Sequence, residues 1–155
     1  MRLWVIAVGQ RSPHWAQEAF DDFHKRFPPD WRVTLKTVKT QAREGEPSAK
    51  LMAQEAERLR QALPPGALVV ALDERGKSYT TQALSKAIAA WSLEFADIAF
   101  VIGGPDGLDP HFKEEARQLM RLSDMTLPHA MVRVLLIEQL YRAWSIQNAH
   151  PYHRE

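Results

Sequence analysis

The sequence predicts one α/β domain built on a parallel sheet. Two runs, residues 67–72 and 98–102, are apolar without interruption, which is typical of parallel strands that are covered on both faces. Segments with apolar residues at helical spacing lie between the predicted strands. A chain of 155 residues with 45% hydrophobic content is long enough to enclose one sizeable core. We therefore expect a single domain over residues 1–155.

The first strand and helix follow from turn and breaker residues. Residues 3–8 are apolar and end at Gly9, which predicts a short strand. Ser12 and Pro13 are favoured at a helix start. We expect that helix to reach about Phe27, because two prolines follow directly.

A half-exposed strand and a second helix come next. Residues 33–38 alternate between apolar and polar side chains, as a strand with one solvated face does. Residues 40–47 are polar and contain Gly45, which predicts a mobile loop of the kind that can form a lid. Residues 47–63 contain good helix formers and end at a Pro-Pro-Gly sequence, which predicts a helix.

Two polar loops are predicted at strand ends in the second half. Residues 73–77 carry charges and a glycine, and we expect them to end the strand at 67–72. Thr80 or Thr81 caps a helix to about Leu93. Loop 103–107 is rich in glycine and follows the strand at 98–102.

The glycine-rich loop is the strongest candidate for a ligand site. Open α/β sheets bind ligands at the carboxyl ends of their strands, and glycines allow sharp turns there. A plain turn into the next helix is the alternative. Asp109 and Pro110 begin that helix, which we expect to end near Met120, and residues 121–127 then form a short segment.

The last predicted helix, residues 130–146, is apolar on nearly every face. A small chain covers such a helix with its own sheet on one side only, which favours a homodimer. Glu138 and Arg142 are four residues apart in it and can pair. A structural ion pair and a catalytic or substrate-holding pair both remain open.

Composition excludes several classes of protein. The chain has no cysteine, which excludes a disulfide scaffold, a thiolate nucleophile and cysteine-bound zinc. The apolar run at residues 3–8 is too short for a signal peptide or a transmembrane helix. We therefore expect a cytoplasmic protein that does not bind membranes.

Charge gives only local indications of a partner. A net charge of +1 does not itself indicate a polyanion. The basic patch Arg32, Lys36, Lys39 and Arg43 has no acidic residue within it, and both an RNA contact and a solvated strand face explain it.

The C-terminal tail contains His150 and His153, but no third ligand has metal-binding spacing with them. We therefore expect no metal. A disordered tail and a tail that lines a site both remain possible.

Five segments together resemble a known family. They are IGGPDGL at 102–108, LSDMTLPH at 122–129, VRVL at 132–135, EQLYRAWSI at 138–146 and HPYHRE at 150–155. With Val8-Gly9 and Leu72-Asp73, they resemble the RlmH family of SPOUT methyltransferases over the whole chain.

This resemblance implies a homodimer with a C-terminal trefoil knot, a feature that sequence periodicity cannot predict. It also implies transfer of a methyl group from S-adenosyl-L-methionine to N3 of a pseudouridine. The implied substrate is the helix 69 loop of 23S ribosomal RNA in the assembled 70S ribosome. The alternative is a non-catalytic RNA- or nucleotide-binding module of related fold that acts in ribosome assembly.

The resemblance also assigns the cofactor contacts to three loops at the sheet edge. The implied residues are Leu72, Gly103, Gly104, Gly107, Leu122, Ser123, Asp124, Met125, Thr126 and Leu127.

The chemistry of the target indicates the remaining roles. N3 of pseudouridine is an imide nitrogen, which becomes nucleophilic only when its proton leaves. The candidate bases are His153, His129 and Glu138, and the candidate cations are Arg142 and Arg154.

We expect Glu138 to orient Arg142 within a catalytic group that also includes His153 and Arg154. Tyr152 is the candidate for stacking on the nucleobase. His129 is a second candidate substrate contact, although a structural hydrogen bond explains it equally well.

Overall fold

Five parallel strands form the centre of the computed structural model, which describes residues 1–42 and 44–154. Their order across the sheet is β2-β1-β4-β3-β5. The strands are β1 (Arg2–Val8), β2 (Arg32–Val38), β3 (Leu68–Ser78), β4 (Asp97–Ile102) and β5 (Gln118–Arg121). Each pair of neighbouring strands is parallel, which confirms the predicted α/β class.

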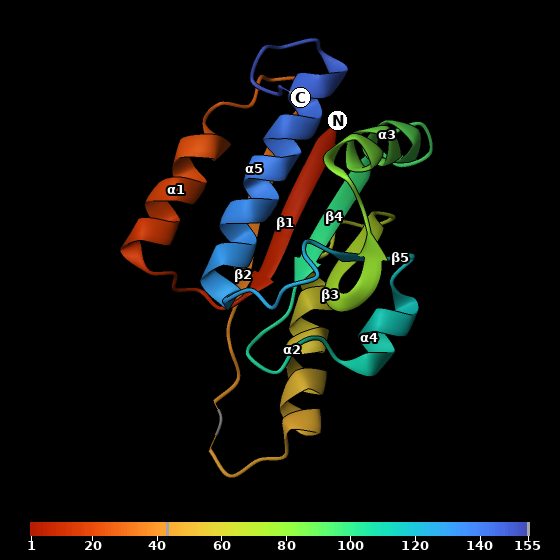
Figure 1. Ribbon diagram of the computed structural model, residues 1–155. Helices are drawn as coiled ribbons and strands as arrows, with labels where there is room; N and C mark the ends of the chain where they lie inside the picture. The colour runs from red at the N-terminus through yellow and green to blue at the C-terminus, as the bar shows by residue number, and fades with distance from the viewer. Residues whose placement is uncertain (43, 155) are drawn as a thin grey trace.

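Helices cover both faces of the sheet (Figure 1). They are α1 (His14–His24), α2 (Ser48–Ala62), α3 (Thr81–Trp91), α4 (Pro110–Glu115) and α5 (His129–Gln147). Core residues of α1, α3 and α5 belong to one hydrophobic cluster, and those of α2 and α4 belong to another. The sheet therefore separates two helical layers.

Strand β4 shows why continuous apolar runs were correct indicators of burial. Ile98, Phe100 and Ile102 pack into the first cluster, and Ala99 and Val101 pack into the second. Successive strand side chains point to opposite faces, so a strand between two helical layers needs an apolar residue at every position.

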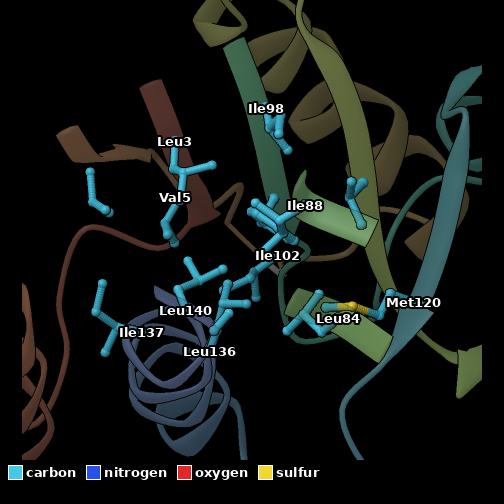
Figure 2. Packing of buried hydrophobic residues seen from close by; sticks show 14 of the residues in the cluster. Leu3, Val5, Leu84, Ile88, Ile98, Ile102, Met120, Leu136, Ile137 and Leu140 are labelled. Carbon is cyan, nitrogen blue, oxygen red and sulfur yellow. The ribbon is translucent and has the colours of Figure 1, made fainter. Parts of the chain in front are cut away.

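The α5 helix packs across the middle of the first face. Figure 2 shows its side chains Leu136, Ile137 and Leu140 pointing toward Leu3 and Val5 of β1. On its other side, Val134 and Leu135 are only partly buried. The chain alone therefore leaves part of this apolar helix accessible.

Strand β3 does not stop where the sequence predicts. The expected polar loop at 73–77 is wrong, because β3 continues to Ser78 and pairs again with β5 after an irregularity. A Cβ atom on Gly76 would lie 2.6 Å from the backbone nitrogen of Met120. Glycine thus permits the close approach of two backbones there, and long-range pairing overrides the local loop signal.

The helix expected from Pro110 to about Met120 is also wrong in extent. Its predicted start is correct, since Asp109 Oδ2 accepts a hydrogen bond from the Phe112 backbone at 3.1 Å. The helix ends at Glu115, and residues 118–121 form β5 beside β3. The free edge of β3 thus provides hydrogen-bond partners for the backbone of residues 118–121, and these residues leave the helix to pair with it.

Asp97 ties the starts of the two central strands together. Its carboxylate accepts hydrogen bonds from Arg2 Nε at 2.7 Å, Arg2 Nη2 at 2.9 Å and Trp4 Nε1 at 2.9 Å. The hydrogen bonds from Arg2 are the main cause that lowers the pKa of Asp97, from 3.8 to about 2.

We expect Asp97→Asn to lower the free energy of unfolding at pH 7 by about 1–3 kcal/mol, because it removes the charge from a buried acceptor of hydrogen bonds from Arg2 and Trp4. Because the pKa of Asp97 is lower in the folded protein, its carboxylate stabilises the fold at pH values above 3.8, the pKa in the unfolded chain. This contribution is lost as the pH falls toward about 2. Urea unfolding at several pH values should therefore show a shallower acid decline in the variant. Exposed Asp30→Asn is the matched control, and an equal acid decline in wild type and Asp97→Asn would contradict the assignment.

Candidate active site

A cavity of about 580 Å³ lies where the carboxyl ends of β4 and β5 meet the middle of β3. Its walls come from the glycine-rich loop 103–107, from the segment that follows β5, and from charged residues of β3. Proteins bind small molecules in cavities of about 300–1,000 Å³. The cavity is therefore the candidate ligand site.

The structure brings most of the predicted cofactor contacts together around this cavity. Those that line it are Leu72, Gly103, Gly104, Gly107, Leu122, Ser123, Met125, Thr126 and Leu127. Asp124 is not in the lining, because its exposed carboxylate pairs with Arg121 Nη2 at 3.0 Å. His129 and Val132, from the first turns of α5, complete this side of the cavity.

The glycine-rich loop folds back on itself and presents its backbone to the cavity. The Gly107 backbone donates to the Gly104 carbonyl at 3.0 Å. A Cβ atom on Gly103 would lie 2.8 Å from the Gly107 carbonyl carbon and 2.9 Å from the Leu108 nitrogen. Only glycine fits at position 103 without moving the loop.

The second group of predicted residues gathers around Glu138, in the middle of α5, and around the C-terminal tail. Glu138 Oε1 accepts hydrogen bonds from Arg142 Nε at 2.9 Å and from Tyr152 Oη at 3.0 Å. Gln139 Nε2 donates to Glu138 Oε2 at 2.6 Å. The predicted contact between Glu138 and Arg142 is present, and the carboxylate is occupied by donors, as an orienting group requires.

Arg142 connects the helix to the tail. Its Nη1 lies 3.3 Å from His153 Nδ1, and its guanidinium lies 4.7 Å from the centre of the Tyr152 ring. Burial is the main cause that raises the pKa of Tyr152, and the hydrogen bond to Glu138 adds to it. The Tyr152 phenol is therefore uncharged at neutral pH.

Aromatic packing fixes the tail against the body of the protein. The centre of the Tyr152 ring lies 4.8 Å from the centre of the Tyr141 ring and 6.3 Å from that of the Phe23 ring in α1. Arg154 is outside the cluster, since it is exposed and its Nε donates to the Pro151 carbonyl at 3.3 Å. Tyr152 and His153 of the tail thus form one group with Glu138, Gln139 and Arg142, which we call the tail cluster. Arg154 lies outside it.

The cavity lies at the start of α5, and Figure 1 shows the C-terminal tail beside the other end of that helix. His129 is the first residue of the helix and lines the cavity, whereas Arg142 is thirteen residues further along. At 1.5 Å per residue the separation is about 20 Å. One chain does not bring the two predicted parts of the site together.

The basic patch has mixed roles. Lys36 Nζ donates to the Ala62 carbonyl at 3.0 Å and lies 4.7 Å from the Trp4 ring, so it supports the fold. Arg32 is exposed at the start of β2, and Lys39 follows the strand. The predicted member Arg43 lies outside the described residues.

Sequence reasoning missed Arg133. Its side chain is 3% exposed and donates to the backbone carbonyls of Val8 and Gly9 at the end of β1. His129, one helical turn earlier, lies with Nε2 3.2 Å from the same Val8 carbonyl. The available signal was an arginine four residues after a histidine inside an otherwise apolar helix.

Residues 1–42 and 44–154 contain neither a metal-binding group nor a membrane-spanning helix. They contain no group of three or more side chains arranged to hold a metal ion. None of their helices is long and apolar enough to cross a membrane.

Comparison with known proteins gives matches over the full length of the chain. A family model described as predicted SPOUT methyltransferase matches residues 1–153. The ribosomal RNA large subunit methyltransferase H of Albidiferax ferrireducens is 61% identical over 155 residues, and that of Paracidovorax citrulli is 59% identical over 155 residues. Each alignment covers 100% of both chains.

A solved structure shows the same fold at low sequence identity. It is a probable methylase family protein from Haemophilus influenzae Rd KW20, with a TM-score of 0.60 and 17% identity. The match covers 99% of this chain and 70% of the other.

Proposed function

Since this chain belongs to the SPOUT methyltransferase family, we propose that it methylates large-subunit ribosomal RNA. The observation that carries this proposal is full-length identity of up to 61% to curated large-subunit ribosomal RNA methyltransferases. The proposed reaction transfers a methyl group from S-adenosyl-L-methionine to N3 of a pseudouridine. The proposed target is the helix 69 loop of 23S RNA in the 70S ribosome in the cytoplasm.

The cavity fits this methyl donor. Its volume of about 580 Å³ suits a nucleoside joined to an amino acid. Leu72, Leu122 and Leu127 provide apolar contacts, and the backbone of the Gly103 loop provides hydrogen-bonding groups. The donor, when bound, supplies a methyl group that is already activated as a sulfonium, so the protein mainly positions the acceptor.

The tail cluster supplies the groups that an imide acceptor needs. Loss of the N3 proton leaves negative charge on the neighbouring carbonyl oxygens, which the guanidinium of Arg142 can stabilise. Glu138 orients Arg142 through the 2.9 Å contact. We assign Tyr152, His153 and Arg154 to the substrate side, and the exposure of Arg154 leaves it accessible to RNA.

A homodimer completes the proposed site. The cavity and the tail of one chain are about 20 Å apart along α5, so the tail that faces a given cavity belongs to a second copy. The partly buried Val134 and Leu135 of α5 supply apolar surface for such an interface. The proposal also includes the C-terminal trefoil knot of the family.

Two measurements test the function. Calorimetry should show binding of S-adenosyl-L-methionine, and mass spectrometry of 23S RNA should show one added methyl on one pseudouridine after incubation with unmodified 70S ribosomes. Ribosomes that already carry the methyl are the control and should accept none. Intact ribosome binding without donor binding would instead favour the non-catalytic assembly module.

A further inference from the structure

The orientation of His129 fixes which ring nitrogen carries a proton. Its Nε2 lies 3.2 Å from the Val8 carbonyl, and a carbonyl oxygen can only accept. Nε2 is therefore the donor, and in the neutral ring Nδ1 carries the lone pair. Within the described chain, no hydrogen bond occupies Nδ1, and the residue is exposed at the cavity.

The surroundings of His129 favour the uncharged ring. It is the first residue of a helix of 19 residues, and the positive end of the helix dipole disfavours a second positive charge. Burial of part of the ring is the main cause that lowers the pKa of His129, and the charge of Arg133 lowers it further. The hydrogen bond to Val8 acts in the opposite direction.

Other charged groups surround the cavity as well. Those in its lining are Asp73, Glu74, Arg75, Asp106, Lys113 and Arg121. On the α2 side, the Glu55 carboxylate lies behind Gly104. The end of β1 presents only the Val8 and Gly9 carbonyls to His129 and Arg133.

Arg133 is a buried cation held by neutral partners. Its side chain donates hydrogen bonds to two backbone carbonyls, and its Nε has no partner among the described residues. A buried charge is costly unless it is paired or used. One helical turn from His129, this charge opposes protonation of the imidazole. Arg133 also donates to the Val8 carbonyl that accepts the hydrogen bond from His129 Nε2.

The other two candidate bases are differently engaged. Glu138 accepts from Arg142, Tyr152 and Gln139. His153 directs Nδ1 toward Arg142 Nη1. In contrast, His129 presents a lone pair at the edge of the cavity in which methyl transfer is proposed.

We propose that His129 Nδ1 is the general base of the methyl transfer and that Arg133 is its positioning residue, an inference that rests on the proposed function. The N3 proton of the nucleobase moves to Nδ1, and the electron pair of the broken N–H bond forms the new N–C bond with the methyl group. The pair of the broken C–S bond stays on sulfur. The imidazolium then releases its proton to water.

The first test needs no catalysis. Nitrogen-15 NMR of the wild-type protein should show His129 as the Nε2-protonated tautomer at pH 7, with a pKa below the ordinary value of about 6.5. An Nδ1-protonated or charged ring at pH 7 would overturn the assignment, whether or not the protein methylates RNA.

The second test distinguishes loss of the general base from loss of donor binding. His129→Gln keeps a donor for the Val8 carbonyl but cannot accept the proton as a base. Single-turnover methylation should fall by about 10²–10⁴-fold, while calorimetric affinity for S-adenosyl-L-methionine is retained. A near wild-type rate would reject the base and leave the proposed function standing. No methylation by the wild type would reject the proposed function instead.

The third test addresses Arg133. Arg133→Gln removes the charge, so the pKa of His129 should rise and the acid limb of the rate profile should move to higher pH. Arg133→Lys keeps the charge and should restore the wild-type limb. A purely structural role would lower the rate at every pH without moving the limb. If Arg133→Gln does not fold, the pKa of His129 in Arg133→Lys must remain below 6.5 for the proposal to stand.

Discussion

Replacing Gly103 with alanine should weaken binding of S-adenosyl-L-methionine by about 100-fold. The new Cβ atom would lie 2.8 Å from the Gly107 carbonyl carbon and 2.9 Å from the Leu108 nitrogen. Both atoms are backbone, so the whole loop must open, and such overpacking costs about 1–3 kcal/mol. Because the same loop lines the cavity, we expect this cost to reduce the free energy of donor binding. Each 1.4 kcal/mol lost there lowers the affinity about tenfold.

Calorimetry on the folded variant measures this effect, and Gly66→Ala is the matched control. Gly66 has φ +74° and open space around its Cβ position, so alanine there carries backbone strain without a clash. Its affinity for the donor should equal that of the wild type. Wild-type affinity in Gly103→Ala would show that this loop does not hold the donor.

Two inactive variants should regain about a quarter of the wild-type activity when their subunits are mixed. Gly103→Ala damages the cavity, and Arg142→Ala removes the tail cation, which should reduce methylation by about 10²–10³-fold. In a twofold dimer with shared sites, each heterodimer contains one site with an intact cavity and an intact tail. Random exchange makes half of the dimers heterodimers, and each has one working site of two.

Co-expression with two different affinity tags gives the mixed dimers, and methylation of 70S ribosomes gives the readout. A mixture of Arg142→Ala with Tyr152→Ala is the control, because every site in that heterodimer carries a damaged tail. It should stay inactive. If verified Gly103→Ala and Arg142→Ala heterodimers also stay inactive, the tail and the cavity do not combine across two subunits.

Local sequence rules were sufficient where the determinants lie within one element. The apolar run 98–102 correctly indicated a strand buried on both faces. The spacing of Glu138 and Arg142 correctly indicated a contact, because residues four apart share a helix face. Thr80 caps α3 through its side chain, as expected from its residue type.

Local rules failed where a distant segment competes. Residues 73–77 look like a loop until β5 pairs with β3 before and after the irregularity, at Leu72 and again at Lys77 and Ser78. The same pairing shortens α4, because residues 118–121 gain strand partners that a helix cannot offer. Arg133 was overlooked since its partners, Val8 and Gly9, are more than 120 residues away.

The sequence by itself determined the order of the strands and helices apart from β5, the burial of the central strands and the residue types gathered near the cavity. These depend on interactions within one or two turns of chain. Only the tertiary structure decided which strand ends meet, and that His129 lines the cavity whereas Arg142 contacts the tail. The physical reason is that pairing across a sheet and burial between layers depend on the whole chain, and no short window of residues contains that information.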